Sequence, residues 1–76
     1  MSQITVTITD LNSQRHRYII YPETTSESIR QFFSYGGLIS LYSSAGYKLD
    51  GNLWALGLRE GEPLWFGMFY TVTPIV

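Results

Sequence analysis

The feature that most constrains this fold is a strict alternation of apolar and polar residues near the N-terminus. Residues 4–9 read Ile-Thr-Val-Thr-Ile-Thr, a period of two that is typical of a β-strand with its apolar side buried. Turn-forming residues follow at 10–13, because Asp, Asn and Ser bond their own backbone. Residues 15–21 are then expected to form a second strand with Tyr18 and Ile20 facing inward. The chain therefore begins with a predicted β-hairpin.

A short helix is expected after the hairpin. Pro22 ends the second strand, because proline cannot donate a ladder hydrogen bond. The segment Thr24-Thr25-Ser26-Glu27 contains Thr-x-x-Glu, a capping-box pattern that opens a helix. Ile29 and the pair Phe32-Phe33 fall on one helical face. Gly36-Gly37 can take the left-handed conformation at no steric cost, so we expect the helix to end there after about ten to twelve residues.

The rest of the chain is predicted to contain four short elements. They are a strand at 38–43, a short edge strand at 47–49, a one-turn helical segment anchored by Leu53, Leu56 and Leu58, and a long aromatic-rich strand at 64–72. Trp54 is expected to be partly buried. We expect a single domain over residues 1–76, with its core at 4–70 and residues 71–76 as a tail.

Composition restricts both the source of stability and the chemistry. The chain has no cysteine, which excludes disulfides, thiolate nucleophiles and thiolate metal sites. Stability must then come from apolar packing, and 45% of the residues are hydrophobic. The twelve aromatic side chains are too many for one small core, so we expect some of them to form an exposed contact surface.

Charge and hydropathy exclude two classes of partner. The net charge is −1 and the five cationic residues are scattered, so we expect no nucleic-acid binding, which needs a basic footprint. No run reaches the roughly 20 apolar residues of a membrane span. The N-terminus leads directly into the first strand without a charged stretch and an apolar block. We therefore expect no signal or transit peptide and a cytoplasmic location.

The order of elements and several segments resemble ubiquitin-like proteins. Residues 4–22 match the hairpin of ubiquitin in length, with Leu11 at its exposed loop leucine. Residues 41–51, Leu-Tyr-Ser-Ser-Ala-Gly-Tyr-Lys-Leu-Asp-Gly, resemble Leu-Ile-Phe-Ala-Gly-Lys-Gln-Leu-Glu-Asp-Gly with one residue inserted and one missing. The pattern Leu53-x-x-Leu56-Gly57-Leu58-x-x-Gly61-x-x-Leu64 is also similar to ubiquitin-like accessory proteins of bacterial type VII secretion. This resemblance, over residues 4 to about 70, implies an α+β ubiquitin-like β-grasp fold with a mixed four- to five-stranded sheet packed on one short α-helix.

Two departures from ubiquitin bear on function. The expected helix is shorter by about a turn, and the C-terminal diglycine is absent. Residues 70–76 read Tyr-Thr-Val-Thr-Pro-Ile-Val, which is β-branched and stiffened by proline. Lys48 is the only lysine, so chain formation would be poorly served. We therefore do not expect a conjugated modifier or a sulfur carrier.

Catalytic and metal-binding equipment is not indicated. His16 is the only histidine, and we interpret it as a surface histidine of the second strand, since nothing in the sequence places a nucleophile and a carboxylate beside it. The six acidic residues are dispersed, so no metal site is expected. The glycines fall at expected turns and do not form a phosphate-binding loop. We expect no enzyme activity and no cofactor.

The last strand carries the candidate binding residues. Alternation places Leu64, Phe66 and Met68 inward and their neighbours Trp65, Gly67 and Phe69 outward. The resemblance implies that the hydrophobic recognition patch of ubiquitin corresponds to four residues here. The expected protein interface consists of Leu11, Tyr42, Trp65 and Gly67, widened by Phe69 and by a second outward row at Ile19 and Tyr21.

Several alternatives stay open at this stage. Trp65 and Tyr42 could pack on one another or be covered by the tail, and Ile19 could be covered locally. The tail could add a strand to a partner's sheet or fold back on its own domain. Functionally, the sequence favours a non-catalytic adaptor that binds a protein partner through the aromatic face. An accessory subunit of a larger assembly (a secretion apparatus, a multi-component oxygenase, a viral or an organellar complex) is the alternative.

Overall fold

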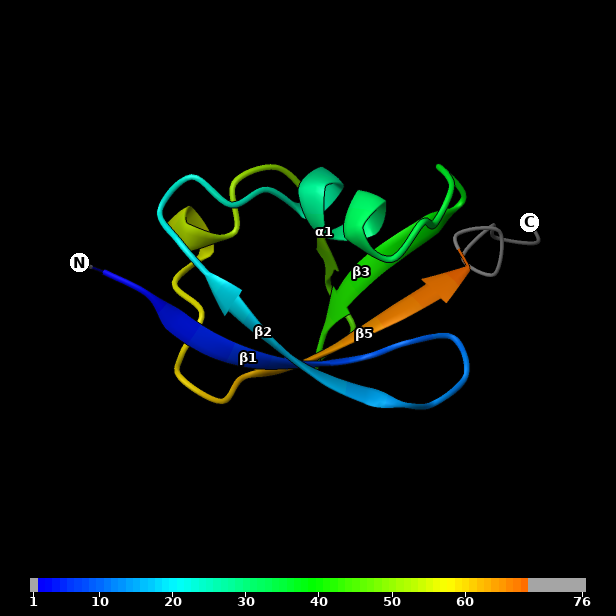
Figure 1. Ribbon diagram of the computed structural model, residues 1–76, viewed down its shortest axis with the longest axis horizontal. Coiled ribbons are helices and arrows are strands. Elements are labelled where there is room, and N and C mark those ends of the chain that lie inside the picture. The colour runs from blue at the N-terminus through cyan, green and yellow to red at the C-terminus, as the bar shows by residue number, and fades with distance from the viewer. Residues whose placement is uncertain (1, 69–76) are drawn as a thin grey trace.

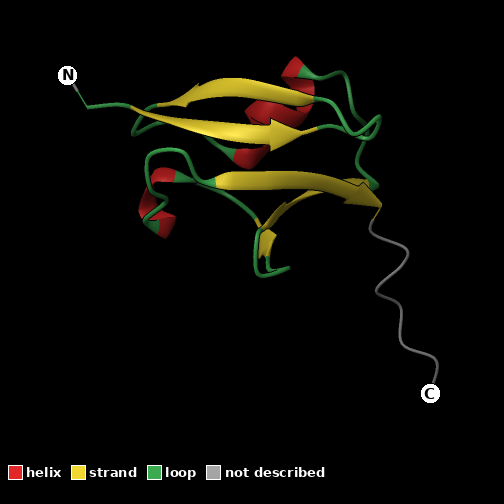
Figure 2. Ribbon diagram, turned by 90° about the horizontal axis from the view of Figure 1, so that it is seen from below, coloured by secondary structure: helices red, strands yellow, loops and turns green. Residues whose placement is uncertain are grey.

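The computed structural model describes residues 2–68, in which a five-stranded sheet carries one helix on one of its faces (Figures 1 and 2). The elements in chain order are β1 (Ile4–Thr9), β2 (Arg15–Ile20), α1 (Ser26–Phe32), β3 (Ile39–Ser43), β4 (Lys48–Leu49), the 3-10 turn η1 (Trp54–Leu56) and β5 (Pro63–Met68). The strands lie in the order β2-β1-β5-β3-β4. The pair β1–β5 is parallel and the other pairs are antiparallel. The expected mixed sheet on one short helix is confirmed.

The N-terminal hairpin forms as its alternation predicts. Each residue of β1 pairs with one of β2, from Ile4 opposite Ile20 to Thr9 opposite Arg15. Val6 and Ile8 are completely buried, and Ile4 packs against the core from its edge. On β2, Ile20 is buried and Tyr18 is half-buried. The sequence pattern therefore identified the buried side of both strands.

The core lies between the sheet and α1. Its buried apolar side chains come from the sheet, from α1 and from the start of η1. They are Val6, Ile8, Ile20, Ile29, Ile39, Leu41, Leu49, Leu53, Leu64 and Phe66. Ile29 is the only side chain of α1 among them. Trp54 is partly buried against this cluster, as expected, whereas Leu56 is 48% exposed and does not anchor the turn. The side chains of Leu53 and Leu58 hold η1 to the core instead.

The start of α1 lies one residue later than the sequence pattern predicted. The N-cap is Thr25, whose side chain accepts a hydrogen bond from the Ser28 N–H while the Ser28 hydroxyl accepts one from the Thr25 N–H. Thr24 is unavailable as a cap because its hydroxyl accepts the N–H of Tyr21 in the preceding turn, at 2.9 Å. The expected Thr24–Glu27 capping box is therefore wrong.

The end of α1 also differs from the prediction. The helix has seven residues and ends at Phe32, well before Gly36-Gly37. Ser34 takes the left-handed conformation, with φ of 61°, while its N–H donates to the Gln31 carbonyl and the Tyr35 N–H donates to the Arg30 carbonyl. This is a Schellman motif with serine in the place usually held by glycine. The early stop leaves Phe32 70% exposed.

The N-terminus of α1 is fixed to the segment after β4. The Ser26 N–H donates to the Gly51 carbonyl, and the Gly51 N–H donates to the Ser26 hydroxyl. The Leu53 N–H donates to the Thr24 carbonyl at 3.0 Å. Ser26 is buried, so these bonds satisfy polar groups that would otherwise be costly to bury. No helix in the described part of the chain is long and apolar enough to cross a membrane.

Candidate interaction face of the sheet

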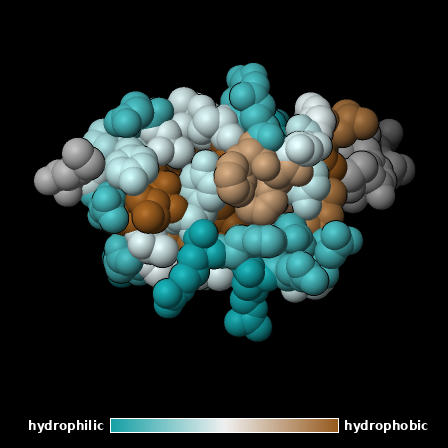
Figure 3. Space-filling view, in the orientation of Figure 1, coloured by the Kyte–Doolittle hydropathy of each residue, from teal (hydrophilic) through white to brown (hydrophobic). Residues whose placement is uncertain are grey.

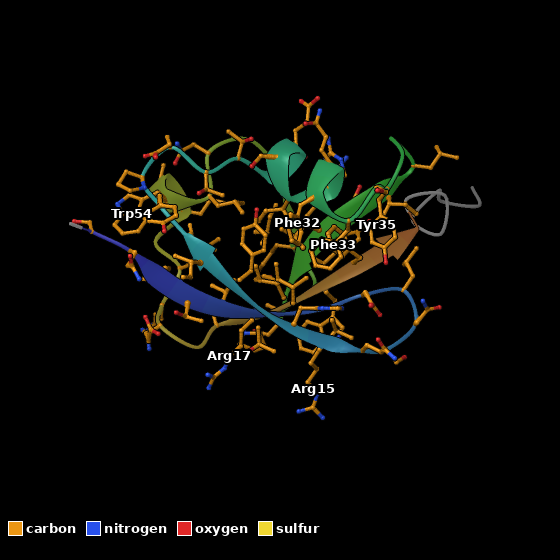
Figure 4. The ribbon with its side chains drawn as sticks, viewed as in Figure 1. Arg15, Arg17, Phe32, Phe33, Tyr35 and Trp54 are labelled. Atoms are coloured by element: carbon orange, nitrogen blue, oxygen red, sulfur yellow. The ribbon has the colours of Figure 1, made fainter. Side chains whose placement is uncertain are left out.

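The sheet has an inner face, which packs on α1, and an outer face, which α1 does not cover. Figure 4 shows Arg15 and Arg17 of β2 pointing away from α1, and Figure 3 shows the corresponding hydrophilic margin of the molecule. Because side chains alternate along a strand, every second residue of each strand shares this side with Arg15 and Arg17. The outer face comprises Thr5, Thr7 and Thr9 of β1, Arg15, Arg17 and Ile19 of β2, Ser40 and Tyr42 of β3, Lys48 of β4, and Pro63, Trp65 and Gly67 of β5.

One row of this face crosses all five strands. The strand registers place Arg15 opposite Thr9, Thr9 beside Trp65, Trp65 opposite Tyr42, and Tyr42 opposite Lys48. Trp65 lies at the middle of the row on the central strand β5. It is 41% exposed. A large aromatic side chain is thus held on the rigid centre of the sheet and left accessible.

Tyr42 leans across Gly67. A Cβ atom added at Gly67 would lie 3.1 Å from Cε2 and 3.3 Å from Cδ2 of the Tyr42 ring, so the ring occupies the space that a larger residue would need. None of the ring pairs within residues 2–68 includes Trp65 or Tyr42. The alternative in which the two rings pack on one another is therefore not observed in this part of the chain.

The other predicted interface residues are not gathered around Trp65. Ile19 is 41% exposed but pairs with Thr5, four residues before Thr9, which corresponds to about 13 Å along the strand. Tyr21 follows the end of β2 and is half-buried. Ile19 and Tyr21 therefore lie apart from the Trp65 row.

Leu11 and Phe69 also differ from the expected patch. Leu11 lies in the hairpin loop and is 43% exposed. Its N–H donates to the Tyr35 hydroxyl at 3.1 Å, on the side of the helix. Phe69 lies outside the described residues, as does the predicted tail. The structure thus brings together Tyr42, Trp65 and Gly67 from the predicted set.

A shallow hollow adjoins Trp65 on the side of β1 and β2. It has a volume of about 490 Å³ and is lined by Thr7, Thr9, Ser13, Arg15, Gly61, Pro63 and Trp65. Sequence reasoning did not find it, because it depends on the parallel pairing of β1 with β5, which brings residues 7–9 beside 63–65. The signal that was available is the period-two run of threonines, which predicts a row of hydroxyl groups on one face.

His16 lies on β2 with its side chain 40% exposed, which agrees with a surface histidine of the strand, but its ring makes two contacts that the sequence did not indicate. Its Nε2 lies 2.8 Å from Oδ2 of Asp10, and its ring packs edge-on against Phe33 with centroids 5.1 Å apart. The hydrogen bond from His16, together with the N–H groups of Gln14 and Asn12, lowers the pKa of the Asp10 carboxyl below its ordinary value. A carboxylate does stand beside the histidine, and the pair fastens the hairpin loop to the helix side.

A cluster of aromatic rings on the helix side was also missed. It is built on Phe33, which contacts His16, Phe32, Tyr35 and Phe66 at centroid distances of 5.1–5.9 Å. Tyr18 joins it through Phe32, and burial raises the pKa of the Tyr18 hydroxyl. Figure 3 shows the exposed part of this cluster as an apolar area at the centre of the view, where Figure 4 labels Phe32. The sequence signal was the spacing Phe32-Phe33-x-Tyr35.

Comparison with known proteins supports the fold. No protein-family model matches the sequence, and no curated protein matches it. Among solved structures, the chain is similar to the ubiquitin-like domain of an Arabidopsis thaliana protein, with a TM-score of 0.71, 19% identity, and 91% of this chain and 80% of that chain covered. It is also similar to a protein designed de novo on the basis of ubiquitin, with a TM-score of 0.68, 12% identity, and coverage of 87% and 88%.

Proposed function

We propose that this chain, which has the ubiquitin-like β-grasp fold, is a non-catalytic module that binds a protein partner non-covalently through the outer face of its sheet. The observation that carries the proposal is the exposure of Trp65 at the centre of the central strand. Exposing a tryptophan there leaves apolar area in water, at about 25 cal/mol per Å². Tryptophan is also the residue most enriched among interface hot spots.

The surroundings of Trp65 support this reading. Tyr42 lies beside it on β3 and Thr9 lies on the other side on β1, so the tryptophan is bordered by an aromatic ring on one side and by a threonine on the other. Interfaces commonly consist of such a buried anchor with a polar rim. Trp65 itself pairs with Thr9 of β1 on one side and with Tyr42 of β3 on the other, which holds the anchor in place before a partner arrives and lowers the entropic cost of binding.

Substitution of Trp65 tests the proposal. Immobilised wild-type chain, Trp65→Ala and Phe32→Ala would be incubated with a lysate of the native source, and the retained proteins compared. Phe32 is the matched control, because it is an exposed aromatic residue on the opposite side of the sheet. We expect a specific partner to be retained by the wild type and by Phe32→Ala, and its affinity for Trp65→Ala to fall at least thirtyfold, or about 2 kcal/mol.

Two results would count against the proposal. Circular dichroism and an amide NMR spectrum must show that Trp65→Ala is folded; if it unfolds, Trp65 is a core residue. If the folded Trp65→Ala variant retains the same partner with unchanged affinity, the outer face is not the interface.

A structural subunit of a larger assembly is a second candidate function. Large hydrophobic side chains are exposed outside the five strands as well, at Phe32 (70%), Leu38 (63%) and Tyr47 (73%). An assembly that buries more than one face would cover them. Size-exclusion chromatography with light scattering separates the candidates: a monomer favours the adaptor, and a defined oligomer favours the assembly subunit.

A further inference from the structure

The hollow beside Trp65 combines an apolar wall with a single cation. Trp65 and Pro63 form one side, and the side chains of Thr7, Thr9, Ser13 and Arg15 line the rest. Arg15 is the only charged residue among those that line it. Three residues with hydroxyl groups and one arginine therefore line the same space as the tryptophan.

The guanidinium of Arg15 is available for a ligand. Within residues 2–68, neither Arg15 nor Arg17 forms an ion pair or a side-chain hydrogen bond with another described residue. Both oxygens of the Asp10 carboxylate in the hairpin loop are already engaged, one by His16 and the other by backbone N–H groups. The hollow thus holds an uncompensated positive charge.

Two acidic residues lie at the other end of the hollow. Glu60 and Glu62 flank Gly61, and their carboxylates are held there by hydrogen bonds: that of Glu60 accepts the N–H of Thr5, and that of Glu62 accepts the N–H of Arg59. The Thr5 end of β1 lies four residues from Thr9, which pairs with Arg15, or about 13 Å along the strand. The Arg15 end is therefore the positive end.

We propose that this hollow binds a carboxylate from an acidic, extended segment of the partner protein, while an apolar residue of the same segment covers Trp65. The inference rests on the proposed function and deepens it by naming the chemistry of the partner. Arginine offers a planar fork that matches a carboxylate with two parallel hydrogen bonds. Threonine and serine hydroxyls can donate to the same group.

The sheet sets the spacing within that segment. Arg15 and Trp65 belong to one row and are two strands apart, so their backbones are separated by about 10 Å. An extended peptide spans this in about three residues. The bound segment is thus an apolar residue with an Asp or Glu two to four positions away. A nucleic-acid phosphate fits less well, because the net charge is −1 and Arg15 is the only charged residue that lines the hollow.

Peptide selection provides the test. Random linear peptides displayed on phage would be selected against the immobilised full-length chain, and the selected peptides synthesised with Glu or Asp and with Gln or Asn at the acidic position. Their affinities would be measured for the wild type, Arg15→Ala, Arg17→Ala and Trp65→Ala. Arg17 is the matched control, since it lies on the same face of the same strand, carries the same charge and does not line the hollow.

We expect acidic residues in the selected peptides. Arg15→Ala should lower the affinity for the acidic peptide at least tenfold, and replacing the acidic residue by Gln or Asn should lower the affinity for the wild type as much. Combining the Arg15→Ala variant with the Gln or Asn peptide should cause no further loss. Arg17→Ala should change affinity less than threefold.

The outcomes separate the two proposals. The inference is overturned, and the proposed function is left standing, if the peptides depend on Trp65 but contain no acidic residue. The same holds if they lose affinity equally with Arg15→Ala and with Arg17→Ala. Selected peptides that bind Trp65→Ala unchanged overturn both. Two further outcomes would assign the hollow another occupant and also overturn the inference. One is displacement of the peptides by millimolar inorganic phosphate at constant pH, with no preference for acidic sequences. The other is self-association of the chain that Arg15→Ala abolishes.

Discussion

Replacing Gly67 with alanine tests the packing at the centre of the outer face. The added Cβ would lie 3.1 Å from Cε2 of Tyr42, whereas non-bonded carbon atoms prefer about 3.5–4.0 Å. Gly67 has no positive φ, so alanine meets no backbone strain at this position. The only obstacle is the Tyr42 ring, which must move by a few tenths of an ångström.

The expected magnitude combines two opposing effects. Overpacking of this kind costs about 1–3 kcal/mol, while exchanging glycine for alanine in a compatible conformation contributes about 0.4–1 kcal/mol through the unfolded state. We therefore expect Gly67→Ala to lower the free energy of unfolding by roughly 1–2 kcal/mol. In a Tyr42→Thr background, where the ring is absent, the same change should stabilise the chain by about 0.4–1 kcal/mol.

Urea unfolding followed by circular dichroism would measure all four members of this double-mutant cycle. Gly36→Ala is the control, because a Cβ added there meets nothing within 4 Å, and it should be equally favourable in both backgrounds. An effect of Gly67→Ala that has the same size and sign with and without the Tyr42 ring would refute the packing described here, and with it the placement of Tyr42 beside Trp65.

Two further predictions follow from local hydrogen bonds. Thr25→Ala removes the N-cap of α1 and should cost about 1 kcal/mol of unfolding free energy, whereas Glu27→Ala, which would remove one partner of a Thr24–Glu27 capping box, should cost no more than about 0.5 kcal/mol. Denaturant melts of both variants would decide between the two registers. Because His16 and two N–H groups hold the pKa of Asp10 below its ordinary value, its contribution to stability is complete above about pH 4 and is lost as the pH falls through the lowered folded value. Asp10→Asn should remove this acid-dependent component from urea midpoints measured between pH 2 and 6. Asp50→Asn is the control, because Asp50 is exposed and lies 3.9 Å from the Lys48 Nζ, and it should leave that component in place. If Asp10→Asn leaves the fall of the urea midpoint at low pH unchanged, the assignment is wrong.

The strands were predictable because their signal is local. The alternation of residues 4–9 determined which side of the hairpin is buried, and the spacing of Leu53 and Leu64 identified further core positions, both of which are completely buried. The alternation in the hairpin requires only that a half-buried strand repeat every two residues. For the same reason, the outward position of Trp65 followed from alternation within its own strand.

The helix boundaries were not predictable, because tertiary contacts decide them. Thr24 and Thr25 are chemically equivalent as caps, and the choice depends on the bond from the Tyr21 N–H and on the pairing of Thr25 with Asn52. Glycine is the usual residue at a left-handed helix end, yet Ser34 takes that role. The hollow could not be foreseen either, since the pairing of Thr9 with Trp65 joins residues far apart in the chain.

The parallel pairing of β1 with β5 also has a consequence for biosynthesis. The last described strand is inserted between β1 and β3, which are made much earlier. Until it arrives, the nascent chain carries two facing edges with unpaired backbone groups, and each can pair with a strand of another molecule. Closing the sheet joins β1 and β5, which are far apart in the sequence, and such long-range pairing slows folding relative to local contacts. The domain is therefore most exposed to misassembly just before its synthesis reaches residue 68, and a segment that fills the same gap would act as a substitute strand.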